Sequence, residues 1–372
     1  MKKSNFTNQK QPVRVLILFL IVTVTACAPQ SQPGLEVEPT PTPYQPATNT
    51  PIPAPTFTST PVTPTITPTP VPPTSTPTTL PPVSEEYLPY TIPYLRSRSY
   101  GSGQIEVLKV IEEREKFTRY LIRYPSDGLN IYGYVNVPKG EGPFPLIIML
   151  HGFARVHEYD TLKNTVMADK FANNGFLVLY PDMRGYPPSD NGDNLYRVGL
   201  AVDVLNLIAL LKEGANQPGR LENADVTRIG LWGISLGGGV ALRVATVSED
   251  IKALLLYSSI SGDEFKNAEL FYTITESQIN LIEMETPPEV MAYISPINYF
   301  DRITTSVKLY HGSLDDAVPS AWAAETCTLL EANNIDIDCI YYLNCGHAAF
   351  SECQPGFYDE VLAFFESQLM EP

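Results

Sequence analysis

The chain is poor in the residues that most often carry metal and redox chemistry, with only 4 histidines, 2 tryptophans and 5 cysteines among 372 residues. No C-x-x-C pair occurs, which disfavours a zinc site built on cysteines. Basic residues are also scarce, since 25 Lys and Arg stand against 41 Asp and Glu and the formal net charge at pH 7 is −16. Such an acidic surface repels nucleic-acid backbones and anionic headgroups, so we expect neither as a partner.

The N-terminal apolar run, over residues 15–26, is too short to span a bilayer of about 30 Å. It follows several basic residues and no acidic one, which predicts a signal peptide over residues 1–26. Val24-Thr25-Ala26-Cys27 at its end is similar to a bacterial lipobox, in which the cysteine is lipidated. We therefore expect an exported protein that contacts the membrane only through lipid on Cys27, on the extracytoplasmic side. An ordinary exported protein cleaved nearby is the alternative.

Proline is concentrated in residues 27–84, which hold about half of the chain's 35 prolines in Thr-Pro repeats such as Pro39–Pro43. Proline donates no backbone hydrogen bond and the segment has almost no aliphatic cluster, so it cannot pack a core. We expect a disordered, extended stalk there. Residues 85–372 are long enough for one domain with a substantial core.

The pattern of apolar residues in this domain predicts an α/β fold. Phe117–Tyr124 and Leu129–Val137 alternate partially around a Ser-Asp-Gly turn and predict an antiparallel hairpin. Apolar runs without alternation follow, separated by helical stretches, which is typical of parallel strands covered on both faces. The predicted strands are 146–150, 176–180, 228–232, 253–257, 307–310 and 337–342, and the predicted helices are 160–173, 195–211, 236–247, 321–333 and 356–369.

One connection between consecutive strands is long. Residues 262–300 are rich in aromatic side chains and predict a small helical cap over the strand ends. These aromatic residues either bury the cap against the body or contact substrate.

Gly233-Ile234-Ser235-Leu236-Gly237 lies between a predicted strand and a predicted helix. The motif alone is weak, but a strand, a sharp turn and a helix with serine at the apex form a nucleophile elbow. The turn pushes the hydroxyl into solvent, and the glycines leave room for the crowded backbone. We therefore predict that Ser235 is a nucleophile rather than a helix cap.

A serine hydroxyl needs a base, usually a histidine that a carboxylate holds in one tautomer. His347 follows the last predicted strand, so its loop would lie at the same edge of the sheet as Ser235. Asp315 follows the preceding strand and is favoured as the acid over its neighbour Asp316 and over Asp263.

Acyl transfer also needs preorganised donors for the carbonyl oxygen as it becomes negative. The predicted oxyanion donors are the amide of Leu236, directly after the nucleophile, and the amide of Phe153, in the loop after the first parallel strand. His151 is expected to shape that loop through hydrogen bonds, and His157 and His311 are expected to be structural.

The turn after the second parallel strand contains Asp182-Met183-Arg184. We expect its acid and its base to fix the loop as a charge pair, which is commoner than a grip on substrate. Asp203, on the next helix, is expected to be structural.

The cysteines other than Cys27 are Cys327, Cys339, Cys345 and Cys353. An even set in an exported chain predicts two disulfides, and of the three pairings sequence proximity favours 327 with 339 and 345 with 353. Metal binding is the alternative. Because the second pair flanks His347, its bridge would stiffen the loop that bears the base.

From about Ser126 onward the chain resembles the α/β-hydrolase superfamily and, within it, the catalytic domain of the prolyl-oligopeptidase-like serine peptidases. The stretches that carry the likeness are Asp127-Gly128-Leu129 with Ile131-Tyr132-Gly133, Leu150-His151-Gly152, Asp182-Met183-Arg184-Gly185, Gly233 to Gly238, and Ser295-Pro296 followed by His311-Gly312 through Val318-Pro319. The resemblance implies a mainly parallel, eight-stranded type of sheet with helices on both faces. It also implies Ser235, Asp315 and His347 as the triad, in the chain order that this fold uses.

Two departures bear on the substrate. Residues 85–116 are too few for the β-propeller that precedes the family's catalytic domain, and no charged residues match the clamps of its aminopeptidases. Esterases of acetyl, feruloyl or dienelactone type share the same short core. We expect a serine hydrolase that acts on short peptides without metal or cofactor. A carboxylesterase for small esters and a non-catalytic surface binding protein are the alternatives.

Overall fold

The computed structural model describes residues 83–370 except 164, 216 and 349. The predicted signal peptide, Cys27 and nearly all of the predicted stalk lie outside the described residues. None of the helices in the described part is both long and apolar enough to cross a membrane.

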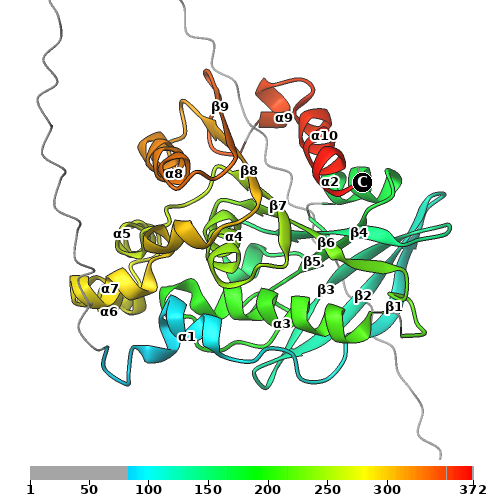
Figure 1. Cartoon of the computed structure of the whole chain (residues 1–372), viewed down its shortest axis with the longest axis horizontal. Coiled ribbons are helices and arrows are strands. Elements are labelled where there is room, and N and C mark those ends of the chain that lie inside the picture. Colours follow the sequence, from blue (N-terminus) through cyan, green and yellow to red (C-terminus); the bar gives the residue numbers. More distant parts are fainter. Residues whose placement is uncertain (1–82, 164, 216, 349, 371–372) are drawn as a thin grey trace, which may run out of the picture. The chain divides into compact units, whose positions relative to one another are not determined.

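A nine-stranded, mostly parallel sheet forms the centre of the described residues (Figure 1). Its strand order is β1-β2-β3-β5-β4-β6-β7-β8-β9. The strands are β1 (Glu106–Glu113), β2 (Phe117–Ser126), β3 (Leu129–Pro138), β4 (Phe144–Leu150), β5 (Leu177–Pro181), β6 (Ala224–Ile234), β7 (Ile251–Tyr257), β8 (Ser306–Gly312) and β9 (Ile337–Tyr342). β1, β2 and β3 pair antiparallel, β3 joins β5 antiparallel, and all pairings from β5 through β4 to β9 are parallel. The α/β-hydrolase fold is confirmed, with β1 as one strand more than the pattern predicted.

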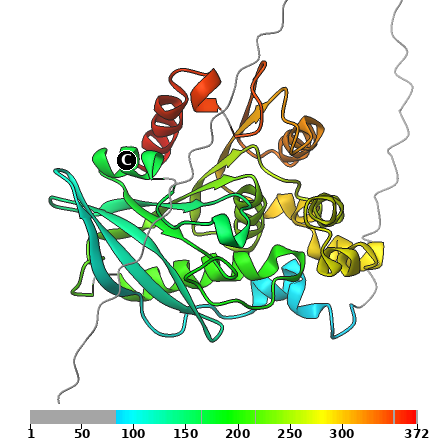
Figure 2. The same ribbon diagram turned by 180° about the vertical axis from the view of Figure 1, so that it is seen from behind.

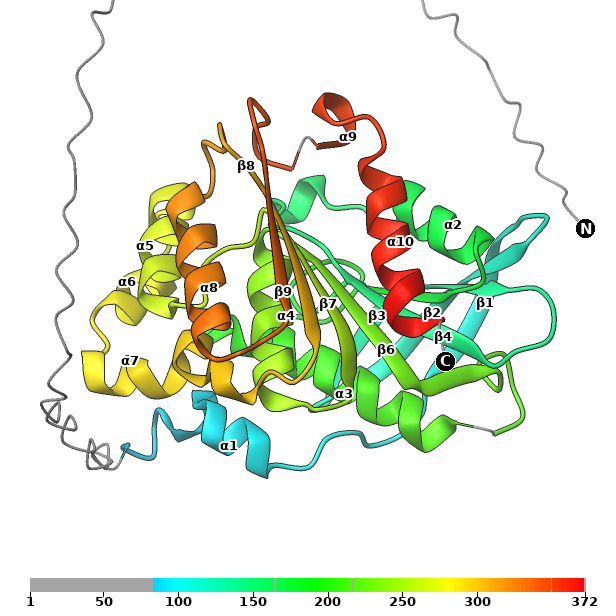
Figure 3. The same ribbon diagram turned by 45° about the horizontal axis from the view of Figure 1, so that its top comes forward.

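Helices cover both faces of this sheet, as the rotated views show (Figures 2 and 3). The longer helices are α2 (Val166–Asn173), α3 (Val198–Gly214), α4 (Leu236–Val247), α8 (Ser320–Ala332) and α10 (Phe357–Leu369). Shorter ones are η1 (Leu88–Tyr90), α1 (Ile92–Ser97), η2 (Val156–Glu158), η3 (Leu195–Arg197) and α9 (Phe350–Cys353). Side chains from α3, α4 and α8 belong to one buried apolar cluster, and side chains from α2 and α10 belong to another. The sheet thus buries both faces, which is why its central strands β4 and β5 are apolar and buried along their whole length.

The connection between β7 and β8 folds as the predicted helical cap. It consists of α5 (Glu264–Thr275), α6 (Gln278–Met284), α7 (Pro288–Ile294) and η4 (Pro296–Arg302). Asp263 and Ser277 cap the N-termini of α5 and α6, since each side chain accepts a hydrogen bond from the amide two residues later.

A buried network of charges ties this cap to the body. Arg197, at the start of α3, donates to Glu264 of α5 and to Glu283 of α6, each at 2.7 Å. Arg243 of α4 donates to Glu264 and, at 2.7 Å, to the Ile294 carbonyl of α7. The positive charges of two guanidinium groups therefore neutralise the negative charges of two carboxylates in the buried interior.

Two predicted helices are shorter than expected. The helix predicted over 160–173 begins at Val166, because Thr161 turns its hydroxyl toward Asp182 instead. The helix predicted over 195–211 is interrupted, because Tyr196 and Arg197 have φ values of 52° and 59°. That break turns Arg197 toward the two cap glutamates.

Both predicted disulfides are confirmed. Cys327 on α8 is bonded to Cys339 on β9, and Cys345 is bonded to Cys353. The second bridge closes a short loop that contains His347.

Candidate active site

Ser235 lies on a strained turn between β6 and α4, at the carboxyl edge of the parallel strands. Its φ of 52° and ψ of −116° are costly for a residue with a side chain. Close packing enforces the turn. A Cβ on Gly233 would lie 2.3 Å from the Gly237 carbonyl oxygen, and a Cβ on Gly237 would lie 2.2 Å from that of Leu150. Only glycine fits at these two positions, which explains the motif physically.

The loops after β8 and β9 bring Asp315 and His347 to this turn. The Ser235 Oγ lies 3.1 Å from His347 Nε2, and His347 Nδ1 lies 2.8 Å and 3.0 Å from the two Asp315 oxygens. With the proton on Nδ1, the imidazole donates to the carboxylate and its Nε2 accepts from the serine hydroxyl. The structure therefore brings together the three side chains that the sequence singled out.

The carboxylate of Asp315 is buried and well satisfied. Burial by itself would raise the pKa of Asp315, but the hydrogen bonds from His347 and from the Val318 amide hold it below its usual value. The Ala317 amide donates to it as well, at 3.0 Å. Asp315 is thus held as an anion that can orient the imidazole.

His311 is closer to this group than the sequence suggested. Its buried Nε2 lies 3.1 Å from the Val318 carbonyl and 3.3 Å from the Asp315 carboxylate. Burial lowers the pKa of His311, which favours the neutral ring. A second imidazole therefore supports Asp315. In the sequence, the only indication of this contact was the spacing of four residues between His311 and Asp315.

The segments that carry the two predicted oxyanion donors lie beside the serine. Leu236 provides the first amide of α4, which has no acceptor within the helix. The loop with Phe153 passes close to Ser235, since a Cβ on Gly152 would lie 3.2 Å from that of Ser235. Both predicted donors thus belong to backbone close to the nucleophile.

The turn after β5 differs from the expectation. Arg184 pairs with Asp203 of α3 at 2.8 Å, in a buried ion pair, and not with Asp182. Asp182 instead accepts from the Tyr159 and Thr161 hydroxyls at 2.6 Å and 3.1 Å. The predicted charge pair within this turn is therefore wrong, because each partner has a better match on a distant segment.

The remaining candidates lie apart from the reacting groups. Asp316 is exposed, Asp263 caps α5, and the exposed His157 lies 3.5 Å from Glu158. His151 is buried with each ring nitrogen 2.8 Å from a backbone carbonyl, as expected for a residue that shapes its loop. In the described part of the chain, no cluster of three or more His, Cys, Asp or Glu side chains is suited to a metal.

Two hollows of about 250 Å³ each lie near the serine. One is lined by Ser235, His347 and the loop that includes Tyr159. The other is lined by Leu236, which follows the serine, and by Phe271 of the cap. Phe153 lines both and packs edge to face on Phe271 with ring centroids 5.7 Å apart. The first hollow gives a substrate carbonyl room next to Ser235.

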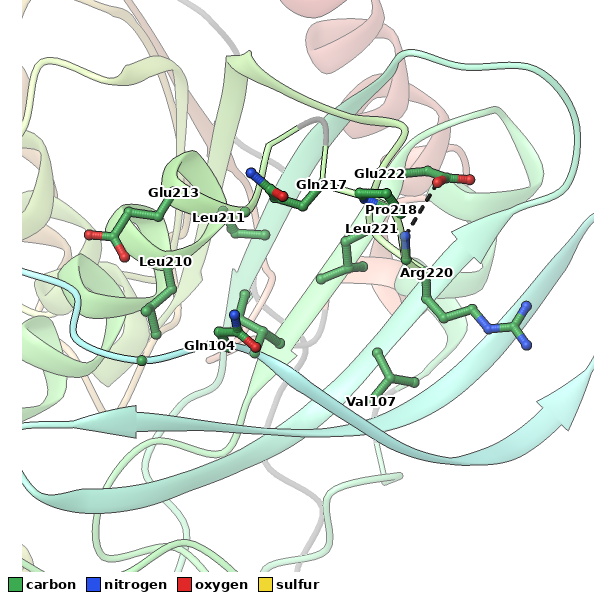
Figure 4. A pocket seen from close by; sticks show the side chains of 14 residues that line it. Gln104, Val107, Leu210, Leu211, Glu213, Gln217, Pro218, Arg220, Leu221 and Glu222 are labelled. Atoms are coloured by element: carbon green, nitrogen blue, oxygen red, sulfur yellow. Dashed lines mark hydrogen bonds between the residues drawn. The ribbon is translucent and has the colours of Figure 1, made fainter.

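A larger cavity, of about 530 Å³, lies elsewhere (Figure 4). It is bounded by β1, the end of α3 and the segment before β6, with Val107, Leu210 and Arg220 among its lining residues. It shares no residue with the two hollows, so its size does not bear on the site around Ser235.

The comparison with known families agrees with this geometry. The sequence profile of the prolyl oligopeptidase family matches residues 164–371, which is more than half of the chain. The chain belongs to the prolyl oligopeptidase family. Proteins similar to the chain include both peptidases and esterases.

Individual relatives of this prolyl oligopeptidase family member are distant. An uncharacterized protein of Escherichia coli is 32% identical over 122 residues, which are 32% of this chain and 38% of that protein. An acetyl esterase of Xylanibacter ruminicola is 24% identical over 236 residues, 55% of this chain and 50% of that enzyme. The chain thus spans about half or less of the length of these two relatives.

Solved structures share the fold. An acylaminoacyl peptidase of Pyrococcus horikoshii has a TM-score of 0.56 at 22% identity, over 70% of this chain and 43% of that one. An acetyl xylan esterase of Thermoanaerobacterium has a TM-score of 0.53 at 19% identity, over 76% of this chain and 92% of that one. At these identities the likeness concerns the fold alone.

Proposed function

We propose that the protein is an exported, lipid-anchored serine hydrolase that cleaves short peptides through an acyl-enzyme. The arrangement of Ser235, His347 and Asp315, with contacts of 3.1 Å and 2.8 Å, is the observation that carries this proposal. Few other arrangements make an alcohol nucleophilic at neutral pH.

The mechanism follows from the contacts. The Ser235 Oγ attacks the substrate carbonyl carbon while its proton passes to His347 Nε2, and Asp315 stabilises the imidazolium. The amides of Leu236 and Phe153 bind the oxyanion. The imidazolium then protonates the leaving amine or alcohol, the C–N or C–O bond breaks, and the acyl-enzyme remains. Water, deprotonated by His347, attacks this ester and restores the serine.

The preference for peptides rests on membership of the prolyl oligopeptidase family. A carboxylesterase is the second candidate, because an acetyl esterase and an acetyl xylan esterase are among the similar proteins. Residues 85–116 form only η1, α1 and β1, so no propeller screens the hollows within the described residues. Either candidate therefore acts on substrates that reach an open site.

One experiment separates the candidates. Hydrolysis of aminoacyl nitroanilides is compared with hydrolysis of nitrophenyl acetate, nitrophenyl butyrate and a feruloyl methyl ester, in the native chain and in Ser235→Ala. We expect turnover of the nitroanilides, and a loss of about 10⁴-fold or more in kcat for Ser235→Ala. Turnover of the esters alone would establish the carboxylesterase. A native chain that a fluorophosphonate probe does not label, together with a Ser235→Ala variant indistinguishable from it, would instead indicate a non-catalytic binding protein.

Three features of the sequence support export and anchoring. They are the predicted signal peptide over residues 1–26, the lipobox-like Val24–Cys27 and the Thr-Pro-rich segment that follows. The lipid would hold the hydrolase at the membrane while the stalk extends the catalytic domain toward substrate. Labelled palmitate should enter the native chain in a bacterial host and should not enter Cys27→Ser. Equal labelling of the two would refute the anchor.

A further inference from the structure

The loop between β4 and α2 carries the Phe153 amide and the wall of one hollow, yet much of it is exposed. It is fastened to the turn after β5 at several points. The His151 Nε2 lies 2.8 Å from the Asp182 carbonyl oxygen. The remaining two points are the Tyr159 and Thr161 hydroxyls, which both donate to the Asp182 carboxylate.

Asp182 lies at the centre of these contacts. Its side chain is fully buried, and none of the ion pairs among the described residues includes it. The rings of His151, Tyr159 and Tyr186 pack against one another in tilted or edge-to-face contacts with centroids 4.5–5.0 Å apart. A carboxylate that faces two hydroxyl donors and no cation is unusual in a protein interior. The arrangement costs stability, which is commonly tolerated where function requires it.

We propose that Asp182 is a positioning residue for catalysis, whose ionised carboxylate tethers the 152–161 loop through Tyr159 and Thr161 and so holds the Phe153 amide toward the oxyanion. The inference rests on the proposed serine hydrolase function. An ionised carboxylate accepts charge-assisted hydrogen bonds from both hydroxyls, whereas a protonated one is a weaker acceptor and its protonated oxygen becomes a donor. Protonation therefore weakens the tether and loosens the loop.

The surroundings place this switch near neutral pH. Burial raises the pKa of Asp182 to about 7, assisted by the charge of Asp160 and opposed by the hydrogen bonds from Tyr159 and Thr161. The other ionisable groups that face it are Tyr124 of β2, Tyr134 of β3, Tyr159 and His151. Burial raises the pKa of each tyrosine and lowers that of His151, so these four stay neutral near pH 7. Asp182 is thus the buried group of this cluster that changes charge there.

Protonation of Asp182 should lower the activity. As the pH falls through about 7, Asp182 takes up a proton and the oxyanion donor loses its support. His347 must also be neutral to act as a base, so two protonations lower kcat/KM on the acid side. In the native chain, log(kcat/KM) should therefore fall more steeply than the slope of 1 that a single protonation gives.

The test measures nitrophenyl acetate hydrolysis from pH 5 to 9 in the native chain, Asp182→Asn and the control Asp336→Asn. Asp336 is an exposed carboxylate that likewise accepts from a hydroxyl, that of Ser306. We expect Asp182→Asn to lower kcat at pH 8 by about 10-fold with KM changed by less than about twofold, because a displaced oxyanion donor acts on the transition state. Its acid limb should have a slope of 1, while the control keeps the native profile.

Tyr159→Phe and Thr161→Val supply the test if Asp182→Asn does not fold. Each removes one hydroxyl donor, which raises the pKa of Asp182, so the acid limb should move to higher pH with an intermediate loss of kcat. A native kcat together with an acid limb at the native pH in these variants would overturn the proposal. Ser235→Ala in the same assay keeps the two hypotheses separate. If it stays active, the serine hydrolase function fails, and if it is inactive while Asp182→Asn behaves as native, only the role of Asp182 fails.

Discussion

The nucleophile elbow and the parts that surround it are held in place by different means. At the elbow, backbone atoms pack so closely that a single added Cβ would meet carbonyl oxygens at 2.2–2.3 Å. The cap and the loop with His347 are held by side chains, through the Arg197, Arg243, Glu264 and Glu283 network and through the disulfide between Cys345 and Cys353. The centre of the site is thus fixed by main-chain packing, and its rim is fixed by contacts between side chains.

The largest loss of activity should come from a substitution at the elbow. Gly237→Ala places a Cβ against the Leu150 carbonyl, so we expect a loss of more than about 3 kcal/mol in unfolding free energy and no measurable hydrolysis. Gly214→Ala is the matched control, because nothing lies within 4 Å of a Cβ there. Thermal unfolding and turnover of both variants check this expectation. A stable, active Gly237→Ala would show that the elbow is less tightly packed than described.

The next largest effect should be a loss of stability when the charge network between the cap and the body is broken. Arg243→Met leaves Glu264 buried with one cation instead of two, and we expect a loss of about 3–5 kcal/mol in unfolding free energy. Arg302→Met removes an exposed partner of Asp301 and should cost less than about 1 kcal/mol. Urea unfolding of the two variants measures the difference. Equal losses would mean that the buried network does not secure the cap.

The smallest effect should come from the base-bearing loop. Replacing Cys345 and Cys353 by serine should lower kcat several-fold, because the loop with His347 gains freedom, and should cost about 2–3 kcal/mol in stability. Replacing Cys327 and Cys339 by serine is the control, since that bridge joins α8 to β9 away from the base. It should lower the melting temperature without lowering kcat. A similar loss of kcat in both double variants would contradict a specific role for the bridge around His347.

The contrast between the elbow, held by main-chain packing, and the rim, held by distant side chains, also explains what could be predicted from the sequence. Ser235, Asp315 and His347 were predictable because each follows an apolar strand, and the carboxyl ends of parallel strands meet at one edge. β1 was missed because its residues are largely exposed and its register with β2 is irregular, so neither face is marked by apolar residues. The partners of Arg184, Arg197 and Asp182 were missed because they lie 19 to 86 residues away in the chain and depend on the final packing. No local pattern encodes such partners.

Asp315, held between two imidazoles and two backbone amides, has a consequence for behaviour in acid. Because its pKa lies below that of an ordinary aspartate, this carboxylate is among the last groups at the site to be neutralised. A chain inactivated by mild acidification would therefore still contain its orienting anion. Returning the medium to neutrality should restore turnover at once, since only protons on neighbouring groups have to leave.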